Sequence, residues 1–126
     1  MTTTPFVRAT LLAVAFCFPA FAQQIAPGTY NVTQMDGSPV RPGVQVRTVL
    51  IPPFFGDMWV GLVYVDTGAG FTMVETENFF MVVRGGVGYW LNNSGNEGHI
   101  DPRADGTLKS TVDTGPNAGT ERLMTR

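Results

Sequence analysis

Short segments rich in Val, Thr, Phe, Tyr and Trp follow one another along the chain, and Gly, Pro, Asn or Asp residues separate them. This pattern is typical of β-strands joined by tight turns. No window carries the 3.6-residue apolar period of a stable helix. We expect strands at residues 28–34, 44–51, 58–65, 71–76, 79–84, 87–91, 107–112 and 120–124. The chain is therefore predicted to be all-β.

Most of these segments alternate apolar and polar residues, as strands do when only one face contacts a core. Val32, for example, lies between Asn31 and Thr33. The segments 58–65 and 79–83 differ, because both of their faces are apolar. Such strands need cover on both sides. A sandwich interior, a dimer interface or a ligand in a cavity would each provide that cover.

About eight short strands with regular turns predict one small antiparallel β-barrel or sandwich of lipocalin-like general shape. The lipocalin comparison concerns architecture alone. A membrane barrel needs strands of about 9 to 11 residues with a lipid-facing side, and most segments here are shorter. We expect no transmembrane segment in the mature chain.

The N-terminus has the layout of a secretory signal peptide. It contains one cation, Arg8, then an apolar run over residues 9–21, and small residues at Ala20 and Ala22. Cleavage after Ala22 divides the chain into a signal peptide, 1–22, and an all-β domain, 23–126. It also removes Cys17, the only cysteine. The mature protein is expected to be periplasmic or secreted.

The charged residues exclude some classes of partner. Eight Lys and Arg stand against ten Asp and Glu, which gives a net charge of −2 at pH 7. The cations are dispersed, whereas nucleic acids and anionic membranes bind concentrated positive charge. Nucleic acid is therefore not an expected partner.

The triplet Asp-Thr-Gly occurs twice, beginning at Asp66 and at Asp113. The run from Val65 to Ala69 resembles the active-site motif of retropepsin-type aspartic proteases. That resemblance implies a homodimer in which each chain contributes one catalytic aspartate. Tyr64 stands where the family carries a smaller residue. Both triplets also follow an alternating strand, where Asp and Gly favour a hairpin turn, and we predict turns at both.

Glu97, His99 and Asp101 alternate along the chain, so an extended backbone would place all three on one face. Such a row suits a divalent metal or a histidine general base. His99 is the only histidine, and Gly98 and Pro102 weaken a strand here. These three residues are therefore weak metal candidates, and we expect no cofactor. A small periplasmic hydrolase or metal-binding protein using them is one alternative function.

Aromatic residues provide the leading hypothesis. Pro52 and Pro53 stiffen a loop that presents Phe54 and Phe55. No serine lies in a nucleophile-elbow motif, so we favour a non-enzymatic, exported domain that binds a small apolar ligand or a protein. An inhibitor that uses the Phe54–Phe55 loop, and a homodimer, remain alternatives. The candidate binding residues are Phe54, Phe55, Trp59, Tyr64, Tyr89 and Trp90.

Overall fold

The computed structural model describes residues 24–126, and the expected signal peptide, 1–22, lies outside the described residues. The described chain contains strands and one 3-10 helix, η1 (Glu75–Glu77). The strands are β1 (Gly28–Met35), β2 (Ser38–Pro39), β3 (Gln45–Ile51), β4 (Met58–Asp66), β5 (Phe71–Met73), β6 (Phe79–Arg84), β7 (Val87–Asn92), β8 (Glu97–Pro102), β9 (Leu108–Thr114) and β10 (Glu121–Thr125).

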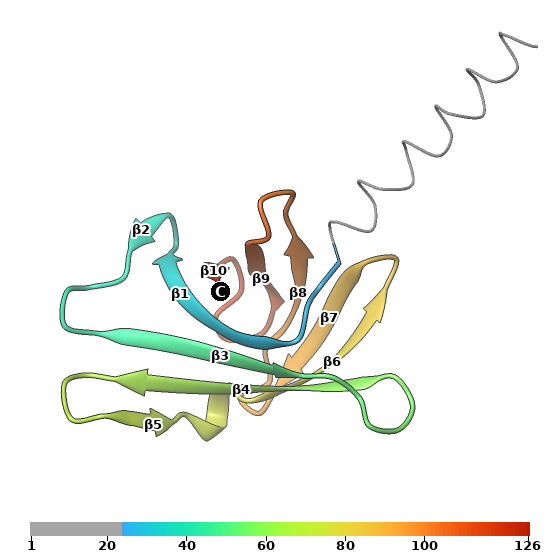
Figure 1. The fold of residues 1–126 in the computed structure, drawn as a ribbon, viewed down its shortest axis with the longest axis horizontal. Coiled ribbons are helices and arrows are strands. Elements are labelled where there is room, and N and C mark those ends of the chain that lie inside the picture. The colour runs from blue at the N-terminus through green and yellow to red at the C-terminus, as the bar shows by residue number, and fades with distance from the viewer. Residues whose placement is uncertain (1–23) are drawn as a thin grey trace, which may run out of the picture.

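The strands form a closed antiparallel barrel (Figure 1). The order around the wall is β1, β3, β4, β6, β7, β8, β9 and β10, and β10 then pairs with β1. Consecutive wall strands are neighbours, so the barrel is a simple meander. Closure leaves the eight wall strands without a free edge. The predicted all-β fold is confirmed, and the barrel replaces the sandwich alternative.

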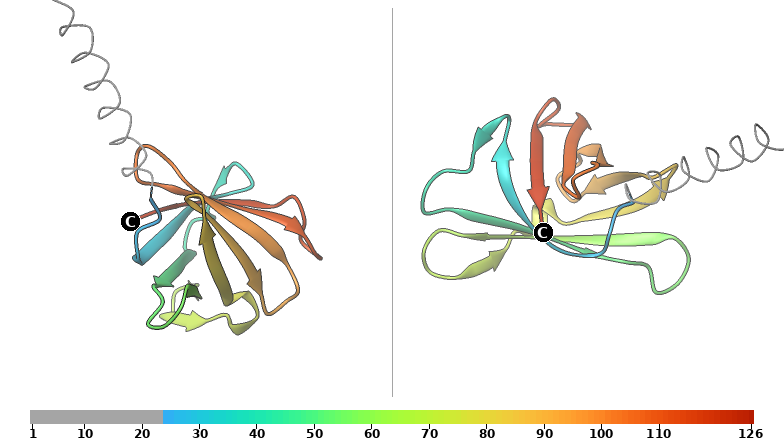
Figure 2. Two further views of the ribbon diagram at one scale, coloured as in Figure 1. Left: turned by 90° about the vertical axis from the view of Figure 1, so that its right-hand side faces the viewer. Right: turned by 45° about the horizontal axis from the view of Figure 1, so that its top comes forward.

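Two short strands extend the wall at one end. β2 pairs with β1, and β5 pairs with β4 to form a two-stranded ribbon (Figure 2). The expected strand at 71–76 is therefore only partly correct, because it stops at Met73 and η1 follows. The segment 97–102, which Gly98 and Pro102 were expected to weaken, is the wall strand β8.

The tight turns have the sequences that their geometry requires. Asp36 and Gly37 both have positive φ, at 53° and 79°, and join β1 to β2. Gly85 and Gly86 do the same between β6 and β7, with φ of 58° and 82°. Positive φ at both central residues defines the type I′ hairpin turn, which matches the twist of the strands.

The interior of the barrel is mainly apolar. Tyr30, Leu50, Met81, Ile100, Leu108 and Met124 are the largest fully buried side chains. Ile25, just before β1, packs into the same core. The Tyr30 hydroxyl donates a 2.7 Å hydrogen bond to the Ala26 carbonyl, which holds this N-terminal segment against the barrel. No helix within residues 24–126 has the length and apolar character needed to cross a membrane.

Candidate functional site

The six aromatic candidates do not form one site. Trp59 and Trp90 lie on the inner side of the wall, where Trp90 is buried and Trp59 packs against the core. Tyr89, next to Trp90, is 52% exposed. The loop residues Phe54 and Phe55 are exposed as well. A single cavity lined by all of them does not exist, because neighbouring residues of a strand point to opposite faces.

The outer wall carries a continuous apolar area, which we call the apolar face. It consists of exposed side chains on four neighbouring strands, with Val60 and Val82 partly buried between them. The register aligns Ile51, Val60, Phe80 and Leu91 in one row and Met58, Val82 and Tyr89 in the next. The exposed members are Ile51, Met58, Phe80, Tyr89 and Leu91.

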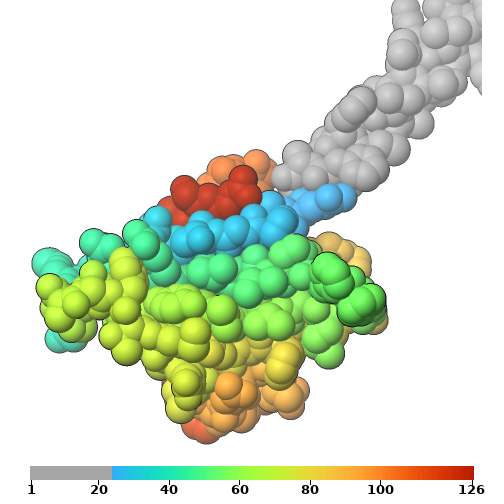
Figure 3. Space-filling view, turned by 60° about the horizontal axis from the view of Figure 1, so that its bottom comes forward, coloured from blue at the N-terminus to red at the C-terminus, as the bar shows by residue number. Residues whose placement is uncertain are grey.

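The apolar face ends in the β3–β4 loop, which projects at the right of Figure 1. Phe54 and Phe55 are 91% and 84% exposed at its end. Their rings meet edge to face with centroids 4.8 Å apart. Ile51 and Met58 flank the loop, so this Phe54–Phe55 tip continues the apolar face. The green β3–β4 loop protrudes from the wall in the space-filling view (Figure 3).

One ion pair borders the tip. The Arg84 guanidinium lies 2.7 Å from the Asp57 carboxylate, and this hydrogen bond lowers the pKa of Asp57. Both side chains are exposed. The charges beside the tip are therefore of both signs and balance each other.

The predicted row of polar residues around His99 lies on one face of a strand, and it gains a further partner from the neighbouring strand. Glu97, His99 and Asp101 lie on the outer side of β8, while Gly98 and Ile100 between them are buried. His99 Nδ1 lies 2.7 Å from Asp113 on β9, and Nε2 lies 3.1 Å from Asp101. Asp113 is thus the second partner of the imidazole. The triplet at Asp113 leads from the end of β9 into the predicted β9–β10 turn, where Gly115 has positive φ, but the Asp113 carboxylate contacts His99 on β8.

The two carboxylates hold His99 as a structural link between β8 and β9. The hydrogen bond that His99 donates to the Asp113 carboxylate is the main cause that raises the pKa of His99, and the charge of Asp101 adds to it. Partial burial acts in the opposite direction. Within the described part of the chain, no group of three His, Cys, Asp or Glu side chains is arranged to hold a metal ion.

Protonation of His99 makes stability depend on pH. Folding raises the pKa of His99, so the protonated imidazole stabilises the folded state. This stabilisation is complete below the unfolded pKa of 6.5 and is lost as the pH rises through the folded pKa. Replacing His99 by Gln should therefore lower the free energy of unfolding more at pH 5.5 than at pH 9. Urea unfolding of both proteins at each pH measures this difference, and an equal loss at both values contradicts the expectation.

Asp113→Asn should lower the pKa of His99 in an NMR titration, because it removes the carboxylate that accepts the Nδ1 hydrogen bond.

Asp66 forms the predicted turn. Its Oδ1 accepts hydrogen bonds from the backbone N–H groups of Gly68 and Gly70, at 2.7 and 3.0 Å. Gly68 and Gly70 have positive φ. The side chain of Asp66 is therefore engaged in closing its own loop between β4 and β5.

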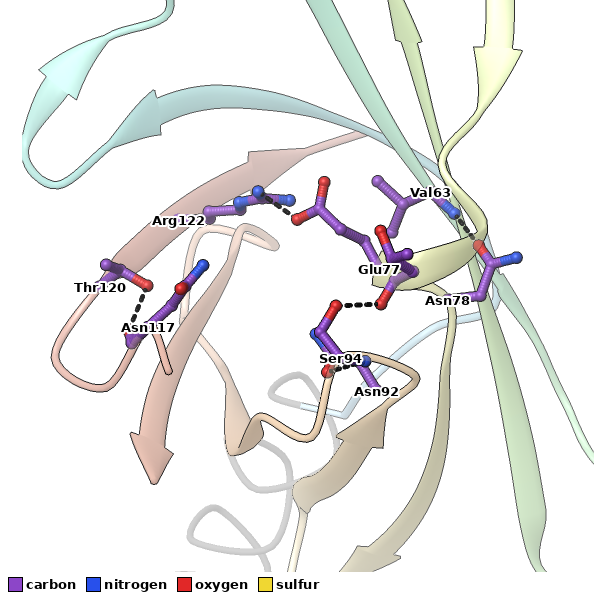
Figure 4. A network of polar contacts seen from close by, with 9 residues as sticks. Val63, Glu77, Asn78, Asn92, Ser94, Asn117, Thr120 and Arg122 are labelled. Atoms are coloured by element: carbon purple, nitrogen blue, oxygen red, sulfur yellow. Dashed lines mark hydrogen bonds and ion pairs between the residues drawn. The ribbon is translucent and has the colours of Figure 1, made fainter. Parts of the chain in front are cut away.

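Polar contacts join the turns at the end of the barrel opposite the Phe54–Phe55 tip (Figure 4). Ser94 Oγ donates to the Thr76 carbonyl at 2.7 Å, which connects the β7–β8 turn to η1. The buried Asn96 accepts a hydrogen bond from the Asn117 N–H at 2.9 Å, which connects it to the β9–β10 turn. These contacts form a polar rim, and the sequence patterns did not indicate it because its members come from separate segments of the chain.

Comparisons with protein-family models, with curated proteins and with solved structures found no match to this chain.

Proposed function

We propose that this protein is an exported, non-enzymatic binding domain whose partner is a protein with an apolar cleft. The Phe54–Phe55 tip enters that cleft, and the apolar face packs around it. The observation that carries the proposal is the continuity between a highly exposed pair of phenylalanines and an exposed apolar sheet surface.

The size of the surface favours a protein partner. The exposed side chains of the tip and the apolar face are between 41% and 91% accessible. With about 150–250 Å² for a large side chain, together they present roughly 800 Å². One partner contributes about 800 Å² to a standard protein–protein interface. Soluble monomers rarely leave an apolar patch of more than a few hundred Å² exposed.

Shape and charge favour the same partner. Two rings at the end of a loop stiffened by Pro52 and Pro53 form a wedge, and a wedge fits a concave surface. Adsorption to an anionic membrane needs a cluster of Lys or Arg. The charges beside the tip are instead the balanced pair Asp57 and Arg84. If the cleft is the active site of an enzyme, the domain acts as an inhibitor.

Photo-crosslinking in the exporting cells tests the proposal. p-Benzoylphenylalanine is placed at position 55 or at position 80, and the adducts are identified by mass spectrometry. The same partner protein should be captured from both positions, since Phe55 and Phe80 lie on one continuous surface.

Position 73 provides the matched control, because Met73 is an exposed apolar residue on β5, which pairs with the end of β4 away from the tip. It should not capture the protein that position 55 captures. Equal capture from position 73 would overturn the proposal. An adduct with a second copy of this chain would also overturn it, since the face would then be a dimer interface.

A further inference from the structure

A cavity lies inside the barrel at the end that carries η1, beneath the polar rim described above. Its free volume is about 70 Å³. A water-sized group occupies about 10–15 Å³ on this measure, so the cavity has room for about five such groups. It is too small for a whole apolar ligand of drug size and suits one end group of a molecule.

The cavity lining combines an apolar floor with a polar rim. Phe79, Trp90 and Ile100 are among the buried apolar residues of the floor. Asn96 and Asn117 belong to the rim, where their contacts with each other are already fixed. A molecule that fits both parts has an apolar end and a polar, hydrogen-bonding group next to it.

Trp90 contributes an unused hydrogen-bond donor. The residue is only 8% exposed, and its Nε1 is buried without a hydrogen-bond partner among the described residues. Buried indole N–H groups usually have a partner, because an unmade hydrogen bond in the interior is costly. The indole ring that carries this donor is part of the cavity lining.

The charges at the cavity balance each other. Arg122 and Glu77 both line it and form an ion pair of 2.6 Å, with side chains 26% and 34% exposed. A charged ligand group would enter a partly buried space without an unpaired countercharge, which is unfavourable. The ligand group is therefore neutral.

We infer that the cavity binds a neutral secondary-amide group of the acetamido type. Its carbonyl oxygen accepts a hydrogen bond from Trp90 Nε1, its methyl group lies against the apolar floor, and its N–H faces the polar rim. An acetamido group has four heavy atoms and fits the available space. The site lies at the opposite end of the barrel from the Phe54–Phe55 tip, and it goes beyond the proposed protein-binding function.

NMR titration of the indole N–H signals with N-methylacetamide tests this inference. The chain has two tryptophans, so Trp59 serves as an internal reference. We expect a saturable, millimolar shift of the Trp90 signal, no shift of the Trp59 signal, and no effect of acetate, the charged analogue. N-acetylglucosamine and an N-acetylated peptide amide compare sugar and peptide sources of the group. Tighter binding of either one supports the site and identifies its source.

Variants complete the test. Trp90→Phe should weaken N-methylacetamide binding by roughly tenfold or more, because the donor is lost, whereas Trp59→Phe should not change it. Ser110→Val adds bulk at the partly buried cavity wall and should also reduce binding. This second variant tests the site even if Trp90→Phe fails to fold. The inference is overturned if the Trp90 signal does not move, if acetate moves it equally, or if these variants bind like the wild type.

Discussion

Replacing Gly98 by alanine is expected to lower the free energy of unfolding by about 3 kcal/mol or more, at the upper end of overpacking effects. A Cβ atom at this position would collide with the Thr111 carbonyl oxygen and with the indole of Trp90. Thr111 belongs to the neighbouring strand β9, so its backbone cannot move without breaking the β8–β9 ladder. For a domain with a total stability of roughly 5–15 kcal/mol, this loss leaves little margin.

Gly61→Ala provides a matched comparison. The new Cβ there would collide with the ring of Phe79, which is a side chain and not backbone. Phe79→Leu should therefore partly rescue Gly61→Ala, while Trp90→Leu should leave most of the Gly98→Ala loss in place. Urea unfolding of the single and double variants measures how far each second substitution restores the free energy of unfolding. A loss below about 1 kcal/mol for Gly98→Ala, the size of an ordinary substitution, would contradict the expected backbone collision.

The local features of the fold were predictable from the sequence. Alternation in 28–34 and 107–112 correctly assigned inward and outward residues, because one buried face imposes a period of two. The Asp36–Gly37 and Gly85–Gly86 pairs lie between expected strands and form turns, since few other residues tolerate their backbone geometry. The two-faced apolar strands were expected to be covered on both sides, and in the structure their outer side chains, such as Met58 and Phe80, form the exposed apolar face.

Features that depend on pairing between distant strands were not predictable. Asp113 contacts His99 only because β8 and β9 pair in a particular register. The sequence places these residues 14 positions apart without a shared motif. The strand β8 was underestimated because Gly98 and Pro102 are poor strand formers. The pairing explains them: Gly98 makes room for Trp90, and Pro102 is the last residue of the strand.

The cavity depends on the same long-range information. Glu77, Asn96 and Arg122 come from a 3-10 helix, a turn and a strand, and only barrel closure brings them to one end. Trp90 was predicted as a binding residue together with its exposed neighbour Tyr89. Their separation to opposite sides of the wall follows from strand geometry, which divides one aromatic cluster in the sequence into two surfaces in space.

Replacing both Phe54 and Phe55 by Ser is expected to weaken binding of the crosslinked partner by at least about 100-fold. Buried aromatic anchors at interface centres typically contribute about 2–4 kcal/mol each when truncated. The free energy of unfolding should stay within about 0.5 kcal/mol of the wild-type value, as for other exposed positions. Titration of the purified partner by isothermal calorimetry, together with urea unfolding, measures both quantities.

The control for this change is Met35→Ser combined with Met73→Ser, which removes two apolar side chains that are 37% and 38% exposed. Both lie at the end of the barrel away from the Phe54–Phe55 tip. This variant should bind the partner with wild-type affinity, because surface apolarity as such is not what the cleft recognises. Equal loss in both double variants would mean that the partner adheres to any exposed apolar residue. Unchanged binding by the Phe54 and Phe55 variant would show that the tip lies outside the interface, which contradicts the proposed wedge.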